Sequence, residues 1–324
     1  MSNAPEWQPS ASLSALKSRA DQLTWLRGFF ANRGVLEVET PVLGRHGVTD
    51  PNLDGISANH SSVAGGARGG WLQTSPEYHM KRLLAAGAGP IYQVARVFRD
   101  GERGRRHNPE FSLLEWYRPG YTDTDLMAEV SDLVCGWLGC DRPVVLPYRD
   151  ALQRFAGLDP FLATDHELMR RCAQWLEPEQ TRTLGRDGCL DLLMSCQVEP
   201  ALADFGPVFI IGYPESQAAL ARVSEYDGVR LAHRFELYVQ GIELCNGYWE
   251  LTDPAEQRAR FNADNRLRRQ SGKSEMAVDL AFVAALEAGI PDCAGVALGL
   301  DRLLMLKLGS SDIADVLAFP LERA

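Results

Sequence analysis

The sequence lacks the cysteine and histidine pattern of a zinc site or of a disulfide-stabilised secreted domain. Its seven cysteines are odd in number, none forms a Cys-x-x-Cys pair, and the six histidines are scattered along the chain. A structural zinc needs four nitrogen or sulfur ligands at short spacings, and disulfides are rare in a reducing cytosol. We therefore expect free thiols and no transition-metal site.

No apolar run is long enough to span a bilayer, and the first residues, MSNAPEWQPS, lack the charged and then apolar pattern of a signal peptide. We expect a cytoplasmic protein without a membrane partner. Positive charge is also scarce, because 33 Lys and Arg stand against 43 Asp and Glu, a formal net charge of -10. Nucleic acids bind surfaces with a broad positive field, so this balance argues against tRNA as a partner.

Two common sequence signatures of nucleotide binding are missing as well. The chain contains neither a Gly-x-x-x-x-Gly-Lys-Ser/Thr phosphate loop nor a Gly-x-Gly-x-x-Gly motif after a strand. Any ATP site must therefore be built from other residues. Repeats, low-complexity linkers and shifts of composition are absent too, and 324 residues suffice for one large domain or two small ones. We expect a single domain over residues 1–324.

Hydrophobic periodicity divides the chain into helices and strands. Helices are predicted over 12–33, 76–87, 122–139, 253–271 and about 277–288, with several more between 150 and 200. Strands are predicted over 35–41, 91–99, 110–118, 206–214 and 234–251, and the glycine-rich residues 59–70 are predicted to be a flexible loop. Since the strands occur in hairpin-like groups rather than regular βαβ units, we predict an α+β fold in which helices flank an antiparallel sheet.

The segment VFRDGERGRRHNPEFSLLEWY, residues 97–117, gathers positive charge in one loop of an acidic chain. The two predicted strands flank a loop that is too long for a two-residue turn. Arg99 ends the first strand, and in the second Phe111 shares a face with Glu115 and Tyr117. A guanidinium binds phosphate in a planar fork and a phenyl ring stacks on a base, so the hairpin suits a nucleotide. The alternative is a solvated hairpin tip whose charges serve solubility.

The segment QGIELCNGYWELTD, residues 240–253, places two acids in apolar strand sequence. Glu243 and Glu250 are seven positions apart, so one regular strand would put them on opposite faces. We therefore expect Asn246-Gly247 to break the register, by a bulge or a tight turn. A buried carboxylate needs a partner or a metal, and carboxylate oxygens beside phosphate suit Mg²⁺. The alternative is an Asn-Gly hairpin with two solvated glutamates.

The segment GVALGLDRLLML, residues 295–306, is predicted to be a buried strand that enters a helix. Gly299 allows another group to approach the backbone closely. Arg302 opens a mostly apolar helix and so needs an anionic partner. Asp301 is the simple structural partner, and a ligand phosphate is the functional one.

The segment TSPEYHMK, residues 74–81, has the pattern of a helix N-terminus, with Thr74 or Ser75 as the cap, Pro76 at the first helical position and Glu77 in the first turn. A capping role does not exclude Ser75 and Glu77 from also facing a ligand.

The basic residues of the predicted helix 253–271 allow two interpretations. Glu256 with Arg260, and Asp264 with Arg268, are four positions apart and can pair on a solvated helix face. The other interpretation is a nucleic-acid surface, which the acidic composition disfavours.

Together these segments resemble the catalytic core of class II aminoacyl-tRNA synthetases of the lysyl kind. RGVLEVETPVL (33–43) resembles motif 1, the hairpin segment motif 2 and GVALGLDRLLML motif 3, while TSPEYHMKRLLAAG and GIELCNGYWELTD resemble segments of lysyl-tRNA synthetases. The resemblance runs from about residue 15 to the end. It implies a class II synthetase-like antiparallel sheet flanked by helices, a homodimer joined through motif 1, and the use of ATP and Mg²⁺. Because motif 1 lies almost at the start, we expect no N-terminal anticodon-binding domain.

This short form is similar to a family of free-standing synthetase paralogues that ligate lysine to elongation factor P. The resemblance implies that the chain activates (R)-β-lysine, or lysine, as an acyl-adenylate. It would then transfer the acyl group to the ε-amino group of a lysine on elongation factor P. Two alternatives stay open: a truncated synthetase that acylates tRNA, and a non-catalytic regulatory paralogue.

Matched residue by residue, the motifs imply a site. The implied catalytic residues are Arg99, Arg302 and Glu243. The residues implied to bind ATP are Arg99, Asp100, Gly101, Glu102, Asn108, Phe111, Glu243, Leu244, Gly299 and Arg302. The residues implied to bind the amino acid are Ser75, Pro76, Glu77, Tyr117, Asn246 and Glu250, and the implied Mg²⁺ ligands are Glu243 and Glu250.

One departure from the family pattern lies at the motif 2 turn. The family usually carries Arg-x-Glu there, and its Glu reads the adenine amino group. This chain has Arg99, Asp100, Gly101 and Glu102 in succession. Either Asp100 or Glu102 is therefore left to take that contact.

Overall fold

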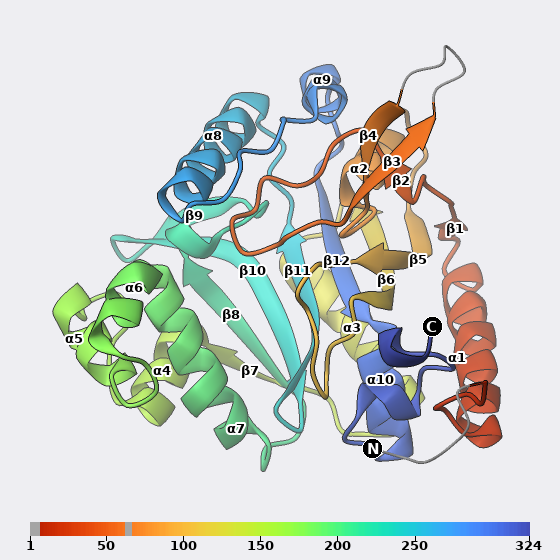
Figure 1. Ribbon diagram of the computed structural model, residues 1–324, viewed down its shortest axis with the longest axis horizontal. Helices are drawn as coiled ribbons and strands as arrows, with labels where there is room; N and C mark the ends of the chain where they lie inside the picture. The colour runs from red at the N-terminus through yellow and green to blue at the C-terminus, as the bar shows by residue number, and fades with distance from the viewer. Residues whose placement is uncertain (1–6, 62–66) are drawn as a thin grey trace. The chain divides into compact units, whose positions relative to one another are not determined.

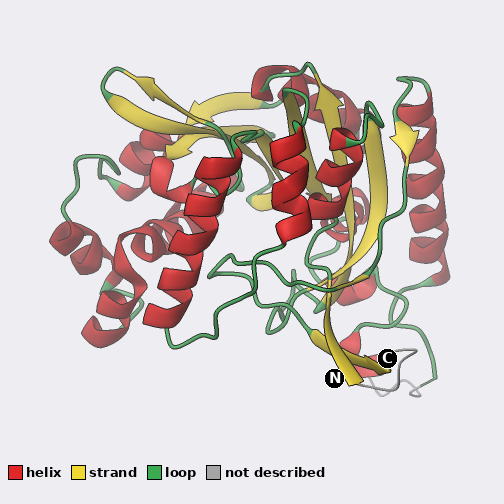
Figure 2. Ribbon diagram, turned by 90° about the horizontal axis from the view of Figure 1, so that it is seen from above, coloured by secondary structure: helices red, strands yellow, loops and turns green. Residues whose placement is uncertain are grey.

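The computed structural model describes residues 7–61 and 67–324, which form two compact units (Figure 1). Unit 1 consists of the described residues within Met1–Gly120, Thr252–Cys293 and Ala297–Ala324, and unit 2 consists of Tyr121–Leu251 and Ala294–Val296. Each unit contains both strands and helices, which Figure 2 distinguishes by colour, so the predicted α+β class is confirmed. In the part of the chain that is described, no helix is at once long enough and apolar enough to cross a membrane. All seven cysteines carry free thiols, as predicted.

The main sheet of unit 1 contains the hairpin that carries the motif 2 segment. It has the strand order β1 (Leu36–Glu37), β5 (Ile91–Phe98), β6 (Glu110–Pro119). Strand β1 is parallel to β5, whereas β5 and β6 are antiparallel. The hairpin is therefore confirmed, while the strand predicted over 35–41 is reduced to two residues. Val97 pairs with Phe111 and Ile91 with Tyr117, so Phe111 and Tyr117 share a face, as the alternation predicts.

A second sheet of unit 1 has the order β2 (Leu43–Gly44), β4 (Ala67–Leu72), β3 (Ser57–Ser61). The flexible loop predicted over 59–70 is therefore wrong for its described residues, and residues 62–66 lie outside the described part. One of the glycines that suggested flexibility, Gly70, has a packing role. A Cβ atom at Gly70 would lie 2.9 Å from Cδ1 of Leu43, so the absence of a side chain lets β2 approach β4 closely.

The helices of unit 1 lie close to their predicted positions. They are α1 (Leu13–Ala31), α2 (Glu77–Ala85), α8 (Pro254–Gln270), α9 (Leu280–Ala288) and α10 (Leu300–Leu308), with short turns η3 (Ile313–Asp315) and η4 (Leu321–Arg323). Strand β12 (Cys293–Gly299) leads into α10. Helix α1 buries Phe30 completely, where its ring stacks on Tyr92 at 4.2 Å between centroids. Asp253 caps α8, since its carboxylate accepts the backbone N–H groups of Ala255 and Glu256.

Unit 2 contains a sheet with the order β11 (Ile242–Trp249), β10 (Val229–Val239), β8 (Val208–Pro214), β7 (Val144–Pro147), and β9 (Val223–Tyr226) pairs with β10. Its helices are α3 (Asp123–Leu138), α4 (Tyr148–Ala156), α5 (Asp165–Cys172), α6 (Pro178–Leu193) and α7 (Glu199–Leu202), with short turns η1 (Met194–Val198) and η2 (Glu215–Gln217). Helices α4 to α7 contribute apolar side chains to one buried core with β8 and β10; α4 packs on β8, α7 on β10, and α5 on α6.

The turn between β10 and β11 corrects one prediction. It lies at Gln240 and Gly241, whose φ angles of 52° and 69° are left-handed, as a two-residue hairpin turn requires. Asn246 and Gly247 stay inside β11. Gly247 is small for a packing reason, because a Cβ atom there would lie 2.3 Å from the ring of Phe235.

The register break itself exists, at a different residue. In the β10–β11 pairing, Tyr238 lies opposite Glu243 and the next residue, Leu237, lies opposite Cys245. Leu244 is therefore the extra residue of a β-bulge. The odd spacing of the two glutamates correctly predicted a bulge, and its assignment to Asn246-Gly247 was wrong.

Candidate active site

Arg99 lies at the end of β5, between an aromatic ring and an acid. Its guanidinium carbon is 5.0 Å from the centroid of the Phe111 ring, and its Nη1 atom is 3.4 Å from Oε1 of Glu102. Its Nε atom is buried and has no hydrogen-bond partner among the described residues. Buried donors are nearly always satisfied in folded proteins, so this one suits an anionic ligand.

The motif 2 turn places its two acids differently. Asp100 is exposed, and its carboxylate accepts the backbone N–H of Gly101 at 2.9 Å. Gly101 has a φ of 75°, which favours glycine over other residues. Glu102 is partly buried beside Arg99. Of the two candidates for the adenine contact, Glu102 therefore lies beside the arginine and Asp100 lies in solvent.

Arg302, at the start of α10, reaches the same loop. Its Nη2 atom is 2.6 Å from Nε2 of His107, and its Nε donates to the carbonyl of Arg106 at 3.3 Å. Asp301, its expected structural partner, instead binds Arg19 and the backbone N–H of Ser112. Within unit 1, motif 3 thus holds the loop that Arg99 begins.

The protonation of His107 matters for this contact. Although the residue as a whole is exposed, partial desolvation of its ring and then the charge of Arg302 lower the pKa of His107. A neutral imidazole has one nitrogen that accepts a hydrogen bond, which is what the guanidinium of Arg302 requires. Protonation of His107 would place two cations against each other.

Two further motif residues are also in unit 1. Asn108 is buried, and both ends of its amide bind backbone groups: Nδ2 donates to the carbonyl of Glu110 at 2.6 Å, and Oδ1 accepts the N–H of Leu321 at 3.1 Å. Asn108 therefore holds the loop in place. A Cβ atom at Gly299 would meet no atom of the described residues closer than the Arg302 side chain at 3.8 Å. The fold itself does not demand glycine there, which leaves room for a ligand.

The residues expected to bind the amino acid in unit 1 gather around a carboxylate that the sequence analysis did not assign to the site. Ser75 Oγ donates to one oxygen of Glu115 and the Tyr117 hydroxyl donates to the other, each at 2.7 Å. Glu115 is 2% exposed. The signal was present in the sequence, because Glu115 is an acid in an apolar strand on the face of Phe111 and Tyr117.

Glu77 has a partner that the sequence analysis also missed. Its carboxylate accepts a hydrogen bond from Lys81 Nζ at 2.7 Å, and Lys81 is fully buried. Ser75 Oγ accepts the backbone N–H of Glu77 at 3.0 Å. The predicted cap is wrong by one residue, because Pro76 is the N-cap residue of α2 rather than its first helical residue. The negative charge of Glu77 is thus compensated inside the protein.

In unit 2, the bulge at Leu244 decides which side chains of β11 share a face. Glu243, before the bulge, lies opposite Tyr238, and Asn246, after it, lies opposite Glu236. Tyr238 and Glu236 are two residues apart and share one face of β10, so Glu243 and Asn246 share a face of β11. Continued by two-residue steps from Asn246, that face includes Glu250, which is 1% exposed. Two carboxylates on one face suit a Mg²⁺ ion.

Asn246 belongs to a polar network on that face. Arg234 donates to Asn246 Oδ1 at 3.3 Å and to Glu236 Oε1 at 2.5 Å. The hydroxyls of Tyr213 and Tyr238 donate to Glu236 Oε2 at 2.5 and 2.6 Å. Burial and then the Glu236 charge raise the pKa of both phenols, so they stay protonated donors. This network fixes the orientation of the Asn246 amide.

The described residues do not contain a cluster of three or more His, Cys, Asp or Glu side chains arranged to hold a metal ion. A Mg²⁺ ion commonly takes one or two carboxylates from a protein and its other ligands from phosphate and water. Glu243 and Glu250 are the two carboxylates that the resemblance implies for such a site.

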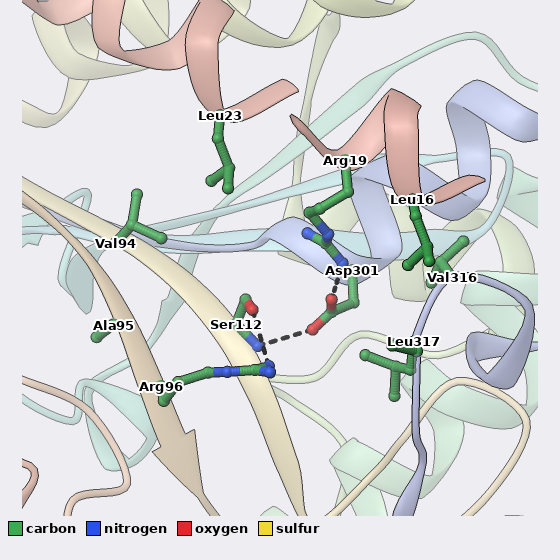
Figure 3. Close-up of a pocket in the computed structure, with 11 residues that line it drawn as sticks. Leu16, Arg19, Leu23, Val94, Ala95, Arg96, Ser112, Asp301, Val316 and Leu317 are labelled. Carbon is green, nitrogen blue, oxygen red and sulfur yellow. Dashed lines mark hydrogen bonds and ion pairs between the residues drawn. The ribbon is translucent and has the colours of Figure 1, made fainter. Parts of the chain in front are cut away.

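A cavity of about 330 Å³ in unit 1 lies apart from the motif residues expected to contact ATP (Figure 3). Neither Arg99 nor Phe111 nor Arg302 lines it. Its lining is mostly apolar, with one ion pair in its wall: Leu16, Arg19, Leu23, Val94, Ala95, Arg96, Ser112, Asp301, Val316, Leu317 and Ala318.

The basic residues of α8 are largely paired within unit 1. The predicted Glu256–Arg260 pair is confirmed, whereas Arg268 binds Asp54 at 3.2 Å rather than Asp264. The ammonium of Lys273, which donates to Asp54 at 2.8 Å, is the main cause of a lowered pKa of Asp54. Paired cations present little free positive charge to a nucleic acid, so the structural interpretation of this helix is favoured.

Comparison with known proteins covers the whole chain. The family model of the class II tRNA synthetases (D, K and N) matches residues 7–323. The chain is 49% identical to the elongation factor P–(R)-β-lysine ligase of Proteus mirabilis (strain HI4320), over 100% of both sequences. It is 47% identical to the protein of the same name from Hamiltonella defensa, over 100% of both. It is also 47% identical to that of Pasteurella multocida (strain Pm70), over 98% of both.

Proposed function

Because the chain belongs to the class II tRNA synthetases (D, K and N), and within them to the elongation factor P–(R)-β-lysine ligases, we propose that it is an ATP-dependent ligase that modifies elongation factor P. Its amino-acid substrate is (R)-β-lysine or lysine. In the structure, the observation that carries the proposal is the arrangement on the motif 2 loop, where Arg99 lies on Phe111 and Arg302 binds His107. Guanidinium groups bind phosphate and an aromatic ring stacks on a base, so together they suit a nucleoside triphosphate.

The first chemical step joins the amino acid to AMP. The substrate carboxylate attacks the α-phosphorus of ATP in line, the bond to the β-phosphate oxygen breaks, and pyrophosphate leaves. Arg99 holds the α-phosphate, Arg302 holds the γ-phosphate side, and Phe111 stacks on adenine. Glu102 reads the adenine amino group. These side chains contribute by positioning and by stabilising the charge that develops on phosphate.

The second step transfers the acyl group. The ε-amine of a lysine on elongation factor P attacks the acyl carbon, an amide bond forms, and AMP leaves with the carbonyl-to-phosphate oxygen. Ser75, Glu115 and Tyr117 are proposed to face the ammonium groups of the amino acid, because a doubly cationic substrate needs a carboxylate in a partly desolvated pocket. Glu243 and Glu250 are the residues proposed to hold Mg²⁺, which would neutralise phosphate charge.

The proposal extends to the state of the protein in the cell. We propose that each chain acts as a single catalytic domain. Two copies would associate through the motif 1 segment to form a cytoplasmic homodimer. The apolar side chains of Leu36, Val42 and Leu43 in that segment are 41–56% exposed in the single chain, which supports a contact there with a second copy.

Two linked assays test the proposed function. Pyrophosphate–ATP exchange with the purified protein should depend on (R)-β-lysine or lysine, and Arg99→Met should abolish it. Labelled amino acid should then be transferred to elongation factor P and not to tRNA. Label on tRNA alone would favour a truncated tRNA synthetase, and exchange that neither lysine stimulates would favour a non-catalytic paralogue.

A further inference from the structure

The buried carboxylate of Asp301 connects two segments of the proposed ATP site. Its Oδ2 atom accepts the backbone N–H of Ser112 at 2.7 Å, and its Oδ1 atom binds the guanidinium of Arg19 from α1 (Figure 3). Ser112 directly follows Phe111, and Asp301 directly precedes Arg302. One side chain thus joins the backbone beside the proposed adenine platform to the backbone beside the proposed phosphate ligand.

A second side chain of helix α1, that of Gln22, binds the residue before Asp301. The Gln22 amide donates to the carbonyl of Leu300 at 3.3 Å and accepts from Arg19 Nη1 at 3.1 Å. Gln22 is fully buried and Asp301 is 2% exposed. A carboxylate so deeply buried is costly without a cation, and the ion pair with Arg19 offsets that cost for Asp301.

We propose that Arg19 and Asp301 are positioning residues for ATP binding. This inference deepens the proposed function and rests on it. Arg19 holds Asp301, and Asp301 holds both the backbone after Phe111 and the first turn of α10. The platform and the guanidinium of Arg302 are thereby kept at the spacing that one nucleotide needs. Displacement of binding groups by about 1 Å is enough to cost about a hundredfold in activity.

The test compares two arginines of α1 that both form ion pairs. Arg19→Met removes the cation and keeps the length of the side chain. Arg27→Met is the matched control, because Arg27 pairs with Glu37 on the surface, where their side chains are 56% and 40% exposed. In lysine-dependent exchange, Arg19→Met should raise the KM for ATP roughly tenfold and change the KM for lysine less than about twofold. Arg19→Lys should restore part of the loss, and Arg27→Met should change neither constant.

An unchanged KM for ATP in Arg19→Met would overturn the inference, and so would an equal rise in the KM for lysine. Asp301→Asn is the second variant, since it keeps the shape and an acceptor for Ser112 while it removes the charge. If thermal unfolding shows that Arg19→Met is not folded at the assay temperature, Asp301→Asn is used in its place. It should then show the same selective rise in the KM for ATP.

Calorimetric titration with ATP and Mg²⁺ separates this inference from the proposed function. If the unmodified protein binds ATP but neither lysine stimulates exchange, the proposed function fails, and the inference is judged by the ATP affinity of the same variants. If the unmodified protein binds no ATP, both proposals fall.

Discussion

At the scale of single residues, the two acids near Ser75 have different hydrogen-bond donors. Glu77 accepts a hydrogen bond from the buried ammonium of Lys81. Glu115 accepts hydrogen bonds from the hydroxyls of Ser75 and Tyr117, two of the side chains expected to bind the amino acid. We therefore expect the Glu115 carboxylate to attract a substrate ammonium group.

Glu115→Gln should selectively weaken the use of the amino acid. The substitution keeps the size of the side chain and removes its charge, and hydrogen bonds to charged groups contribute about 1.5–3 kcal/mol. The KM for lysine in the exchange assay should therefore rise about tenfold or more, with a smaller change for ATP. Glu110→Gln on the same strand is the control, because its side chain is 49% exposed. Equal behaviour of the two variants would contradict the assignment.

At the scale of elements, two glycines illustrate different reasons for the same residue type. Gly247 lies in β11, where the ring of Phe235 occupies the space of a side chain. Gly28 lies on an exposed position of α1, and apart from its own helix backbone no described residue has an atom within 4 Å of an added Cβ. The first is required by packing between strands, and the second only weakens a helix.

Alanine at these two positions should have opposite effects. Gly247→Ala should lower the free energy of unfolding by about 1–3 kcal/mol, because the strand or the Phe235 ring must shift. Gly28→Ala should raise it by about 0.5–1 kcal/mol, because alanine restricts the unfolded chain and favours helix. Urea unfolding followed by circular dichroism measures both. A stabilising Gly247→Ala would show that β11 is not held against Phe235 as described.

Strand β11 shows which part of a β-bulge can be predicted from the sequence of one strand. The seven-residue spacing of Glu243 and Glu250 correctly predicted that the alternation of faces had to break. The position of the break could not be read from β11 alone, because a bulge is defined by the partner strand. Strand β10 places the extra residue at Leu244, and Asn246-Gly247, a strong turn signal by itself, is retained inside the ladder.

At the scale of the whole molecule, charge argues for a protein acceptor over a nucleic acid. The formal net charge is -10. Cations of α8 are engaged by acids such as Glu256 and Asp54. Lys273, just after the helix, also binds Asp54. A surface that binds phosphate backbones needs unpaired Lys and Arg that release counterions.

The protein should not bind tRNA at physiological ionic strength. Non-specific protein–nucleic acid complexes typically have Kd values of about 10⁻⁴–10⁻⁶ M, so an acidic chain should show no electrophoretic shift of labelled tRNA below about 100 µM protein. A salt-sensitive shift at low micromolar concentration would contradict this expectation. It would also renew the case for tRNA as the acceptor.

The sequence by itself determined most elements, the two arginines of the motifs and the need for a break in β11. Caps, periodicity and motif spacing act over a few residues, so they can be read along the chain. Only the tertiary structure decided which charges meet: Asp301 binds Arg19 and not the adjacent Arg302, and Arg302 binds His107. A buried charge takes whichever opposite charge or dipole the fold brings to it, and that partner can lie anywhere in the sequence.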